Sequence, residues 1–350
     1  MSDLPAQHFR EPGIYIGLPE ADYHASRAIG GSGFKAFVYQ EIEFWWESDH
    51  NPYRPDRKVG EAADFGSAVH ALLLEGREAY ESRFYAESFD PDAHPGALAT
   101  NEDMRAALRE LGLPVGGNKP VLRERLEDAG FDGGFMDDLR AEWEAEREGR
   151  TRISPKWWNR LALFAAIRER DPKLVEIFSE GLPEVSVFWM DKGLRCRARF
   201  DWLRRDATYD VKTYSAREGQ LPHEAMSKAV QFRRYDLQEA HYRAARAAMP
   251  SLPVFGGTPE QQAYVEACMA EPDPGFTFLF AKTQGAPIVS TYDADILRVS
   301  ARSDYLRTMD RIRQFTDHFG GLGEPWVPGA DHHTMELEDV FASFGIGAAA

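Results

Sequence analysis

The sequence predicts an α/β protein in which a mixed central sheet is flanked by helices, and three observations support this fold class. Apolar residues recur at helical spacing through most of the first half of the chain. From Val185 to Thr213 apolar and polar residues instead alternate, which is typical of strands joined by short turns. A long helical segment from about Pro222 then precedes two more alternating segments, 276–281 and 287–292, and a final helix. Helices on both sides of such a strand cluster indicate a layered α/β or α+β core.

Composition indicates a folded protein of a reducing cytoplasm. Of the 350 residues, 28% are charged and 43% are hydrophobic, a balance typical of globular chains rather than disordered ones. The two cysteines, Cys196 and Cys268, exclude a disulfide framework and any four-cysteine zinc or iron–sulfur site. No apolar run approaches the roughly 18 residues of a membrane-spanning helix, and the N-terminus lacks the features of a secretory signal. We therefore expect a cytoplasmic protein without a membrane partner.

Charge is unevenly distributed along the chain. The net charge of −16 argues against a protein that coats nucleic acid over its whole surface. Residues 195–246 nevertheless hold twelve Lys and Arg against seven Asp and Glu. An acidic body with one basic segment can bind a phosphate backbone locally and repel it elsewhere. The alternative is an unevenly charged, solvated surface, and charge alone does not separate the two.

The N-terminal half is predicted to be mainly helical. One helix is expected from about Ser32 to Trp46, and a second from about Glu61 to Leu74, where Gly76 ends it. Residues 86–100 are expected to form a loop. Three further elements complete this half: a helical hairpin over 101–130, an exposed polar helix or linker over 132–150, and a helix from Pro155 to about Arg170.

The C-terminal half carries the predicted strands. Residues 185–190, 195–201 and 207–213 are expected to pair as an antiparallel meander, because short turns join them. A long helix is expected from about Pro222 to Ala247. The last thirty residues are rich in Gly and Ala, and we expect only part of them to be ordered. Between these lie a helix over 259–269, the strands 276–281 and 287–292, and a helix over 294–318.

The triplet Asp210-Val211-Lys212 is the main candidate for chemistry. Side chains at i and i+2 of a strand share a face, so Asp210 and Lys212 point together while Val211 points to the core. A carboxylate can hold a hard divalent cation there, and an ammonium can orient water or neutralise phosphate charge. Antiparallel pairing can bring Asp201 beside Asp210, and Glu184 opens the first strand of the meander. Taken alone, such a triplet is more commonly a surface ion pair.

These carboxylates also indicate which metal would bind. Three oxygen donors without a cysteine or multi-histidine cluster favour Mg²⁺ or Mn²⁺ over zinc. His70 lies one helical turn after Gly66. Because glycine has no side chain, Gly66 can let this helix approach a neighbour or a ligand closely. His70 is therefore a candidate metal ligand or phosphate contact. The alternative, favoured for His70 in isolation, is a helix histidine bonded to a backbone carbonyl.

The long helix supplies a third candidate surface. Gln231, Tyr235, Gln238 and Tyr242 follow one another at spacings of four, three and four residues and so share one face. A Gln and Tyr face with neighbouring arginines suits a DNA backbone next to a metal centre. The alternative is an amphipathic helix whose tyrosines pack on the sheet. The arginines of this helix are Arg233, Arg234, Arg243 and Arg246.

The ordered series of these motifs resembles a known family. Its members are G66SAVH70, Glu184, Asp201, D210VK212 and Q238EAHY242. In this order they resemble the RecB-type branch of the PD-(D/E)XK nucleases, and more closely the RecE-type exonuclease VIII proteins of prophages. The segment from Gly13 to Phe37 also resembles the opening of that group. The resemblance covers about residues 13–85 and 182–320.

The resemblance implies a role for each matching position. Asp201 and Asp210 would ligate Mg²⁺ (Mn²⁺ can substitute), with the Val211 carbonyl as a further ligand. Glu184 would be an additional acidic donor, and Lys212 would position the attacking water and stabilise charge on the phosphate. The remaining matches are His70, which would complete or orient the metal shell, and Gln238 and Tyr242, which would support the site and contact DNA. Arg197, Arg199, Arg233 and Arg234 are the arginines that we expect to contact DNA.

The activity implied by the resemblance is metal-assisted hydrolysis of double-stranded DNA. Digestion in this family runs 5′→3′ and leaves a 3′ single strand for an annealing partner of the RecT type. A ring-shaped homo-oligomer and an origin in a phage or prophage are part of the same expectation. Two alternatives stay open: a PD-(D/E)XK endonuclease, and a non-catalytic DNA-binding scaffold that keeps the nuclease fold.

Residues 101–130 depart from the nuclease pattern. They resemble a SAP-type DNA-binding motif, two short helices around a GLPVxGxK turn that contains Gly112 and Lys119. The turn would present backbone N–H groups and Lys119 to a phosphate. This segment holds five Lys and Arg against six Asp and Glu, so a hairpin that only packs on the nuclease is the alternative.

Five regions are therefore expected along the chain. The nuclease is expected to begin with an N-terminal part that carries the histidine helix and to continue, after the insertion, with a catalytic core. The regions are 1–100 for the N-terminal part, 101–130 for the SAP-like insertion, 131–181 for a helical linker, 182–320 for the PD-(D/E)XK core and 321–350 for a tail.

Overall fold

The computed structural model describes residues 10–54, 60–271 and 274–327. Contacts between Cα atoms divide the chain into two compact units. The first unit combines Met1–Lys58 with Val175–Ala350, and the second is Val59–Leu174. In the described part of the chain, no helix is both long and apolar enough to cross a bilayer.

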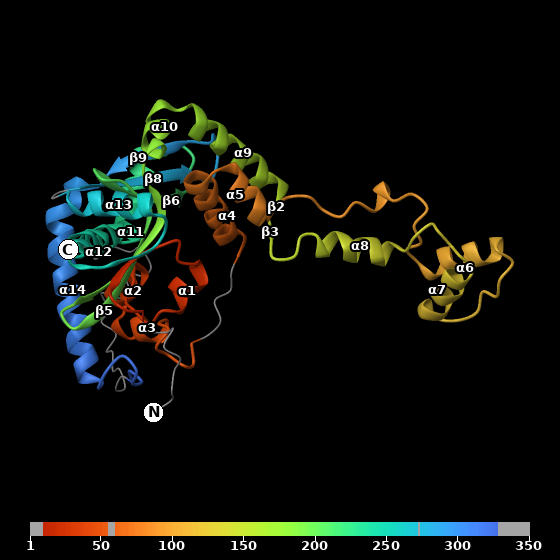
Figure 1. The fold of residues 1–350 in the computed structure, drawn as a ribbon, viewed down its shortest axis with the longest axis horizontal. Helices are drawn as coiled ribbons and strands as arrows, with labels where there is room; N and C mark the ends of the chain where they lie inside the picture. The colour runs from red at the N-terminus through yellow and green to blue at the C-terminus, as the bar shows by residue number, and fades with distance from the viewer. Residues whose placement is uncertain (1–9, 55–59, 272–273, 328–350) are drawn as a thin grey trace, which may run out of the picture. The chain divides into compact units, whose positions relative to one another are not determined.

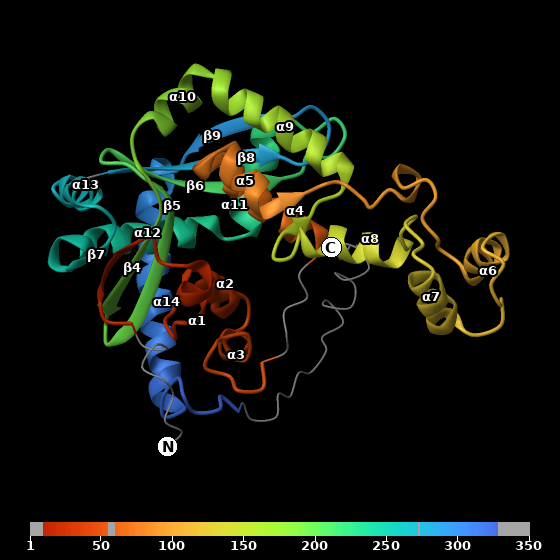
Figure 2. The same ribbon diagram turned by 45° about the vertical axis from the view of Figure 1, so that its right-hand side comes forward.

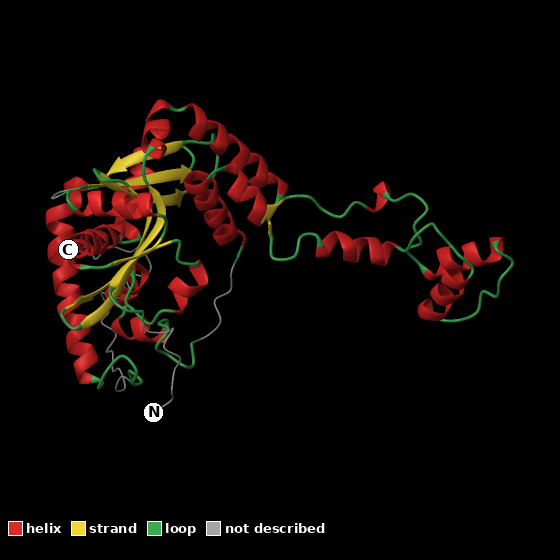
Figure 3. Ribbon diagram, in the orientation of Figure 1, coloured by secondary structure: helices red, strands yellow, loops and turns green. Residues whose placement is uncertain are grey.

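The first unit is built on a seven-stranded mixed sheet, which confirms the predicted α/β fold class (yellow in Figure 3). The strand order is β7-β1-β4-β5-β6-β8-β9. The pairs β1–β4, β4–β5, β5–β6 and β8–β9 are antiparallel, whereas β1–β7 and β6–β8 are parallel. The strands span Gly13–Ile16 (β1), Leu182–Asp191 (β4), Leu194–Leu203 (β5), Ala207–Tyr214 (β6), Val254–Gly256 (β7), Gly275–Lys282 (β8) and Val289–Asp293 (β9).

Helix α12 is the central helix of this unit. It contacts β4 and β5, and α2 and α14 pack against it (Figures 1 and 2). Its buried side chains join those of the sheet in one apolar core, which includes Phe34, Phe200 and Phe278. The helices of the unit are α1 (Glu20–Ala25), α2 (Gly31–Tyr39), α3 (Glu41–Trp46), α10 (Pro172–Ser179, at the unit boundary), α11 (Pro222–Phe232), α12 (Tyr235–Ala248), α13 (Pro259–Met269) and α14 (Arg298–His318), with 3₁₀ turns at Met249–Ser251 and Asp295–Leu297.

Two predicted helices are each broken into a pair. The expected helix over residues 32–46 is interrupted at Gln40, whose φ of −161° and ψ of 118° are extended. The expected helix over residues 222–247 is interrupted at Arg234, which adopts a left-handed conformation with φ 49° and ψ 45°. Hydrophobic spacing did not reveal either break, because the apolar residues on both sides still face the same core.

The start of the expected C-terminal tail belongs to the core. Trp326 is only 2% exposed, and its ring packs against those of Phe44, Phe315 and Phe319. The indole N–H of Trp45 donates to the Leu322 carbonyl at 3.0 Å. The described part of the region 321–350 therefore packs on the core of the first unit. Residues 328–350 of the expected tail lie outside the described residues.

The second unit is helical, with a small parallel pair of strands. Its hairpin confirms the prediction for residues 101–130: α6 and α7 pack through Met104, Leu108, Leu122 and Leu126, all 0% exposed. Thr100 caps α6 in a capping box, which begins the helix at Asn101. The elements are α4 (Glu61–His70), a π-helix (Ala71–Glu75), α5 (Arg77–Arg83), β2 (Phe84–Tyr85), a 3₁₀ turn (Pro91–Ala93), α6 (Asn101–Glu110), α7 (Lys119–Asp128), α8 (Met136–Ala145), β3 (Thr151–Arg152) and α9 (Pro155–Arg170).

Candidate functional site

Asp201 and Asp210 meet where β5 and β6 stop pairing. The described ladder between these strands consists of Trp202↔Tyr209 and Leu203↔Thr208. Beyond it, the Asp201 carboxylate accepts a hydrogen bond of 2.6 Å from the Val211 backbone N–H. This bond places the Asp201 carboxylate beside the residue that follows Asp210, the neighbourhood that antiparallel pairing predicted. Both are buried, with exposed fractions of 7% for Asp201 and 0% for Asp210.

The Asp210 carboxylate is held by two side chains. Its Oδ1 accepts a hydrogen bond of 2.9 Å from Gln238 Nε2, and its Oδ2 forms an ion pair with Lys212 Nζ. Burial lowers the pKa of Lys212, but the charges of Asp210 and Asp201 outweigh burial, so its pKa is raised. Lys212 therefore stays protonated at neutral pH. A buried carboxylate is tolerable only with such partners.

Helix α12 supplies polar side chains that support the Asp210 carboxylate. Gln238 lies one turn before Tyr242. Its Nε2 also donates a hydrogen bond of 3.3 Å to the Tyr242 hydroxyl oxygen. Both residues are buried against the sheet. The structure thus brings Gln238 and Tyr242 to Asp210, through the i, i+4 spacing that the sequence displayed.

Glu184 lies on β4, opposite Asp201 on the neighbouring strand β5. The β4–β5 register pairs Pro183 with Trp202 and Val185 with Phe200, which sets Glu184 opposite Asp201. A carboxylate oxygen of Glu184 lies within 4.8 Å of one of Asp201. Glu184 has a φ of 53°, a strained value for a residue other than glycine, and such strain is often found at functional sites.

Arg197 and Arg199 hold the N-terminal segment, whereas the sequence predicted contacts with DNA. The Arg197 guanidinium donates to the carbonyls of Tyr23 (2.6 Å) and His24 (3.1 Å) and pairs with Asp49. Arg199 donates to the Leu18 carbonyl at 2.6 Å, and its guanidinium lies 3.4 Å from the Glu184 carboxylate. Their side chains are only 12% and 11% exposed. These donors are used inside the unit, where both arginines anchor the N-terminal segment, and their contacts with DNA stay a prediction.

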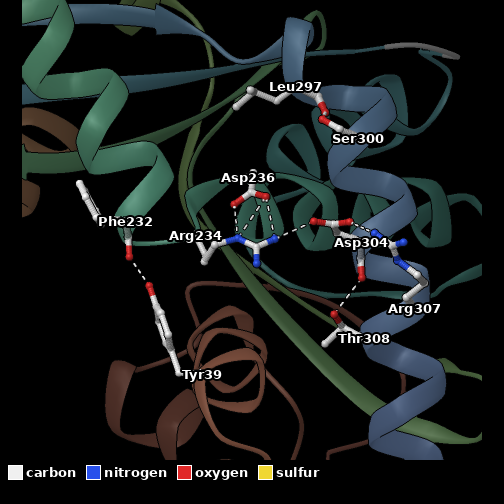
Figure 4. Close-up of polar contacts among 9 residues, drawn as sticks. All are labelled: Tyr39, Phe232, Arg234, Asp236, Leu297, Ser300, Asp304, Arg307 and Thr308. Carbon is white, nitrogen blue, oxygen red and sulfur yellow. Dashed lines mark hydrogen bonds and ion pairs between the residues drawn. The ribbon is translucent and has the colours of Figure 1, made fainter. Parts of the chain in front are cut away.

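The predicted pair Arg233 and Arg234 divides at the helix break, where Figure 4 shows the contacts of Arg234. Arg234 forms ion pairs with Asp236 at 3.0 Å and with Asp304 of α14 at 2.9 Å, so it ties α12 to α14. Arg233 is exposed beside it. Tyr39 of α2 donates its hydroxyl to the Phe232 carbonyl at the same break. Arg233 has the exposure that a DNA contact requires, and contacts of both arginines with DNA stay predictions.

Lys119 is engaged within the second unit. Its ammonium forms an ion pair with Asp137 of α8 and donates to the Ala99 carbonyl at 3.4 Å. Arg123 of the same helix binds both carboxylate oxygens of Asp138, which lowers the pKa of that carboxyl. A phosphate at Lys119 would therefore have to displace Asp137.

His70 lies in the last turn of α4 and is half-buried. It belongs to the second unit, whereas Glu184, Asp201, Asp210 and Lys212 belong to the first. Its role in the site stays a prediction. Within its own unit, a Cβ added at Gly66 would meet no described atom within 4 Å, so packing in that unit does not require this glycine.

Lys35 was not identified from the sequence. It lies on α2, and its Nζ donates to Gln238 Oε1 at 3.2 Å. Burial, and next the charge of Lys212, lower the pKa of Lys35 to about 8. The two partners are 203 residues apart, and no spacing pattern in the sequence links them.

Comparisons with known proteins agree with this architecture. Residues 100–129 match the model of the SAP domain family. The whole structure is similar to the crystal structure of a candidate exonuclease from Eubacterium rectale, with a TM-score of 0.50 and 13% sequence identity. The alignment covers 93% of this chain and 99% of that chain. A search of curated proteins gives no match. The structural similarity therefore supports the α/β fold, and residues 100–129 are similar to a SAP domain.

Proposed function

We propose that the protein is a Mg²⁺-dependent exonuclease of double-stranded DNA, of the RecE type within the RecB-like branch of the PD-(D/E)XK nucleases. The observation that carries this proposal is the placement of three carboxylates and a lysine on three adjacent strands. Glu184 and Asp201 offer oxygens within 4.8 Å of each other, and Asp201 binds the N–H of the residue between Asp210 and Lys212, which form an ion pair. Buried carboxylates of like charge are costly to bring together, and a bound cation offsets that cost. The similarity to a candidate exonuclease and the SAP match support the same function.

The donor set fits a hard divalent cation. Asp201, Asp210 and Glu184 offer carboxylate oxygens, and the Val211 carbonyl offers another oxygen in the same strand. When bound, Mg²⁺ would lower the pKa of a water ligand and withdraw charge from the phosphate. His70 enters this ligand set through the family resemblance.

The chain's own residues have distinct tasks in this mechanism. Lys212 stays protonated and orients the attacking water while it neutralises charge on the phosphate. Gln238 fixes the Asp210 carboxylate, and Tyr242 lies behind it. The SAP-like residues 100–129 would hold the duplex. Digestion from the 5′ end, a RecT-type annealing partner, a ring-shaped oligomer and a phage or prophage origin follow from the resemblance and belong to the proposal.

The test uses linear double-stranded DNA labelled at the 5′ or the 3′ end. With Mg²⁺, wild type is expected to release the 5′ label, and EDTA is expected to stop the release. Asp210→Asn is expected to reduce cleavage by about 10³-fold or more, because it removes a metal ligand. Asp206→Asn, in the exposed turn before the same strand, is the matched control.

Covalently closed circular DNA separates the alternatives. An exonuclease leaves the circle intact, whereas nicking of the circle would show an endonuclease. If wild type cleaves neither substrate with Mg²⁺ or Mn²⁺ but still binds DNA, the protein is a DNA-binding scaffold with a nuclease fold.

A further inference from the structure

We propose that Lys35 is a second phosphate-binding lysine of this site and contacts the DNA phosphate that lies beside Asp210 and Lys212. The inference rests on the proposed function and adds a substrate-binding residue to it. Lys35 reaches the site from α2, a helix that contributes no other residue to the cluster of carboxylates.

The position of the Lys35 ammonium links it to Asp210 through the side chain of Gln238. Its Nζ donates to Gln238 Oε1 at 3.2 Å, and the amide of the same Gln238 donates to Asp210 Oδ1 at 2.9 Å. The ring of Tyr235 lies beside two lysines, with Lys35 Nζ at 4.9 Å and Lys212 Nζ at 5.3 Å from its centroid. Two ammonium groups thus converge on one carboxylate, one directly and one through an amide.

The two lysines differ in what balances their charge. Lys212 forms an ion pair with Asp210. Among the described residues, Lys35 has no carboxylate within ion-pair distance, and its one hydrogen-bond acceptor is the neutral amide of Gln238. An ammonium has three donors, and a desolvated one without an anion is costly. Lys35 therefore has donors available for an anion that the protein itself does not supply.

The substrate provides an anion of the required kind. A phosphodiester placed at Asp210 and Lys212 carries negative charge on its non-bridging oxygens, and a charge-assisted hydrogen bond from Lys35 would stabilise it. Burial lowers the pKa of Lys35 in the free protein. A phosphate beside the ammonium would stabilise its charged form and oppose this effect of burial. Gln238 would hold the ammonium in the direction of that phosphate.

The test compares Lys35→Gln, Lys35→Arg and wild type in the full chain. Lys228→Gln is the matched control, because Lys228 is an exposed lysine on α11 of the same unit. Single-turnover cleavage of linear duplex DNA is measured with Mg²⁺ at saturating protein. DNA affinity is measured in the Asp210→Asn background over a series of salt concentrations, so that binding is read without cleavage.

The proposal predicts two linked effects for Lys35→Gln. The single-turnover rate falls by about tenfold to a hundredfold, and the slope of log affinity against log salt becomes shallower by about one. Lys35→Arg restores the slope, since it restores the cation, and Lys228→Gln leaves the cleavage rate unchanged. Thermal unfolding of each variant identifies any that fails to fold. If Lys35→Gln fails, Lys35→Met takes its place in both assays, with the same expected losses of rate and of salt slope.

The outcomes separate this proposal from the function on which it rests. An unchanged rate and an unchanged salt slope in folded Lys35→Gln, with wild type active, would overturn the role of Lys35 alone. A lower rate with an unchanged salt slope would also overturn it, because Lys35 would then act on the protein and not on a phosphate. Absence of cleavage by wild type would overturn the proposed function.

Discussion

At the scale of single residues, the site is a set of buried charges with specific partners. Asp210 is fully buried and is bound by the Gln238 amide and the Lys212 ammonium. Asp201 satisfies the backbone N–H that the opened ladder leaves at Val211. Each of these residues therefore serves the fold as well as the proposed chemistry. The effect of a substitution has to be measured on both thermal stability and DNA cleavage.

His241 shows how a buried group next to this site makes stability depend on pH. It is 0% exposed among aromatic rings, its Nε2 lies 2.8 Å from the Arg197 carbonyl, and burial lowers its pKa to about 4. In the unfolded chain its pKa is near the ordinary value of about 6.5, so only the unfolded state takes up a proton between these values. Stability is therefore lost as the pH falls from about 6.5 towards 4.

We expect this loss to reach about 3 kcal/mol for His241 by pH 4. His241→Gln does not titrate and keeps a polar group for the Arg197 carbonyl. Urea unfolding at pH 7.5 and pH 5 is expected to show a smaller loss of stability in the variant than in wild type. An equal loss in both proteins would show that other groups, such as His50, account for the dependence.

At the scale of elements, the break between α11 and α12 is fixed by tertiary contacts. Arg234 adopts a left-handed conformation, which costs roughly 1 kcal/mol for a residue with a side chain. Its ion pairs with Asp236 and Asp304 compensate for this cost (Figure 4). The break separates Gln231 from the helix that holds Gln238, so the four-residue face predicted for one helix is divided.

The SAP-like hairpin is a second case, because the acidic N-terminus of α8 occupies its basic side chains. Asp137 pairs with Lys119, and Asp138 pairs with Arg123. We expect the double variant Asp137→Asn/Asp138→Asn to bind duplex DNA more tightly. The slope of log affinity against log salt is expected to steepen by up to about two, because two cations become available for phosphates.

Titrations in the Asp210→Asn background over a salt series measure this effect without cleavage. Asp132→Asn is the control, since Asp132 is an exposed acidic residue of the same unit without an ion pair among the described residues. If the double variant and the control bind alike, α7 does not present Lys119 and Arg123 to DNA.

At the scale of the whole molecule, the first unit brings together segments from both ends of the chain around one acidic cluster. Repulsion among the carboxylates of this cluster weakens the folded state in the absence of a cation. A ligand that binds the folded state alone stabilises it by mass action. The proposed metal site therefore predicts a thermal signature that does not depend on activity.

Wild type is expected to gain about 1.4 kcal/mol of stability when Mg²⁺ is present at about ten times its Kd. Asp201→Asn and Asp210→Asn are expected to lose this gain, while Asp206→Asn keeps it. Thermal unfolding with MgCl₂ and with EDTA measures the difference. An equal rise in all four proteins would indicate a general salt effect and no specific site.

The sequence by itself determined the features that depend on neighbouring residues. The helices Pro155–Arg170 and Pro259–Met269, the hairpin of residues 101–130 and the three-strand meander follow from local periodicity and turn signals. The shared face of Asp210 and Lys212 follows from the two-residue period of a strand. These predictions succeeded because the information for them lies within a few residues.

Only the tertiary structure decided which distant groups meet. The ion pair that fixes Arg234 comes from a residue 70 positions away, and the amide that joins Lys35 to Asp210 belongs to a third segment. Trp326 is buried by rings from both ends of the unit, although the composition around it predicts a tail. Periodicity reports the face that a segment buries, whereas the partner on that face is set by the packing of the whole unit.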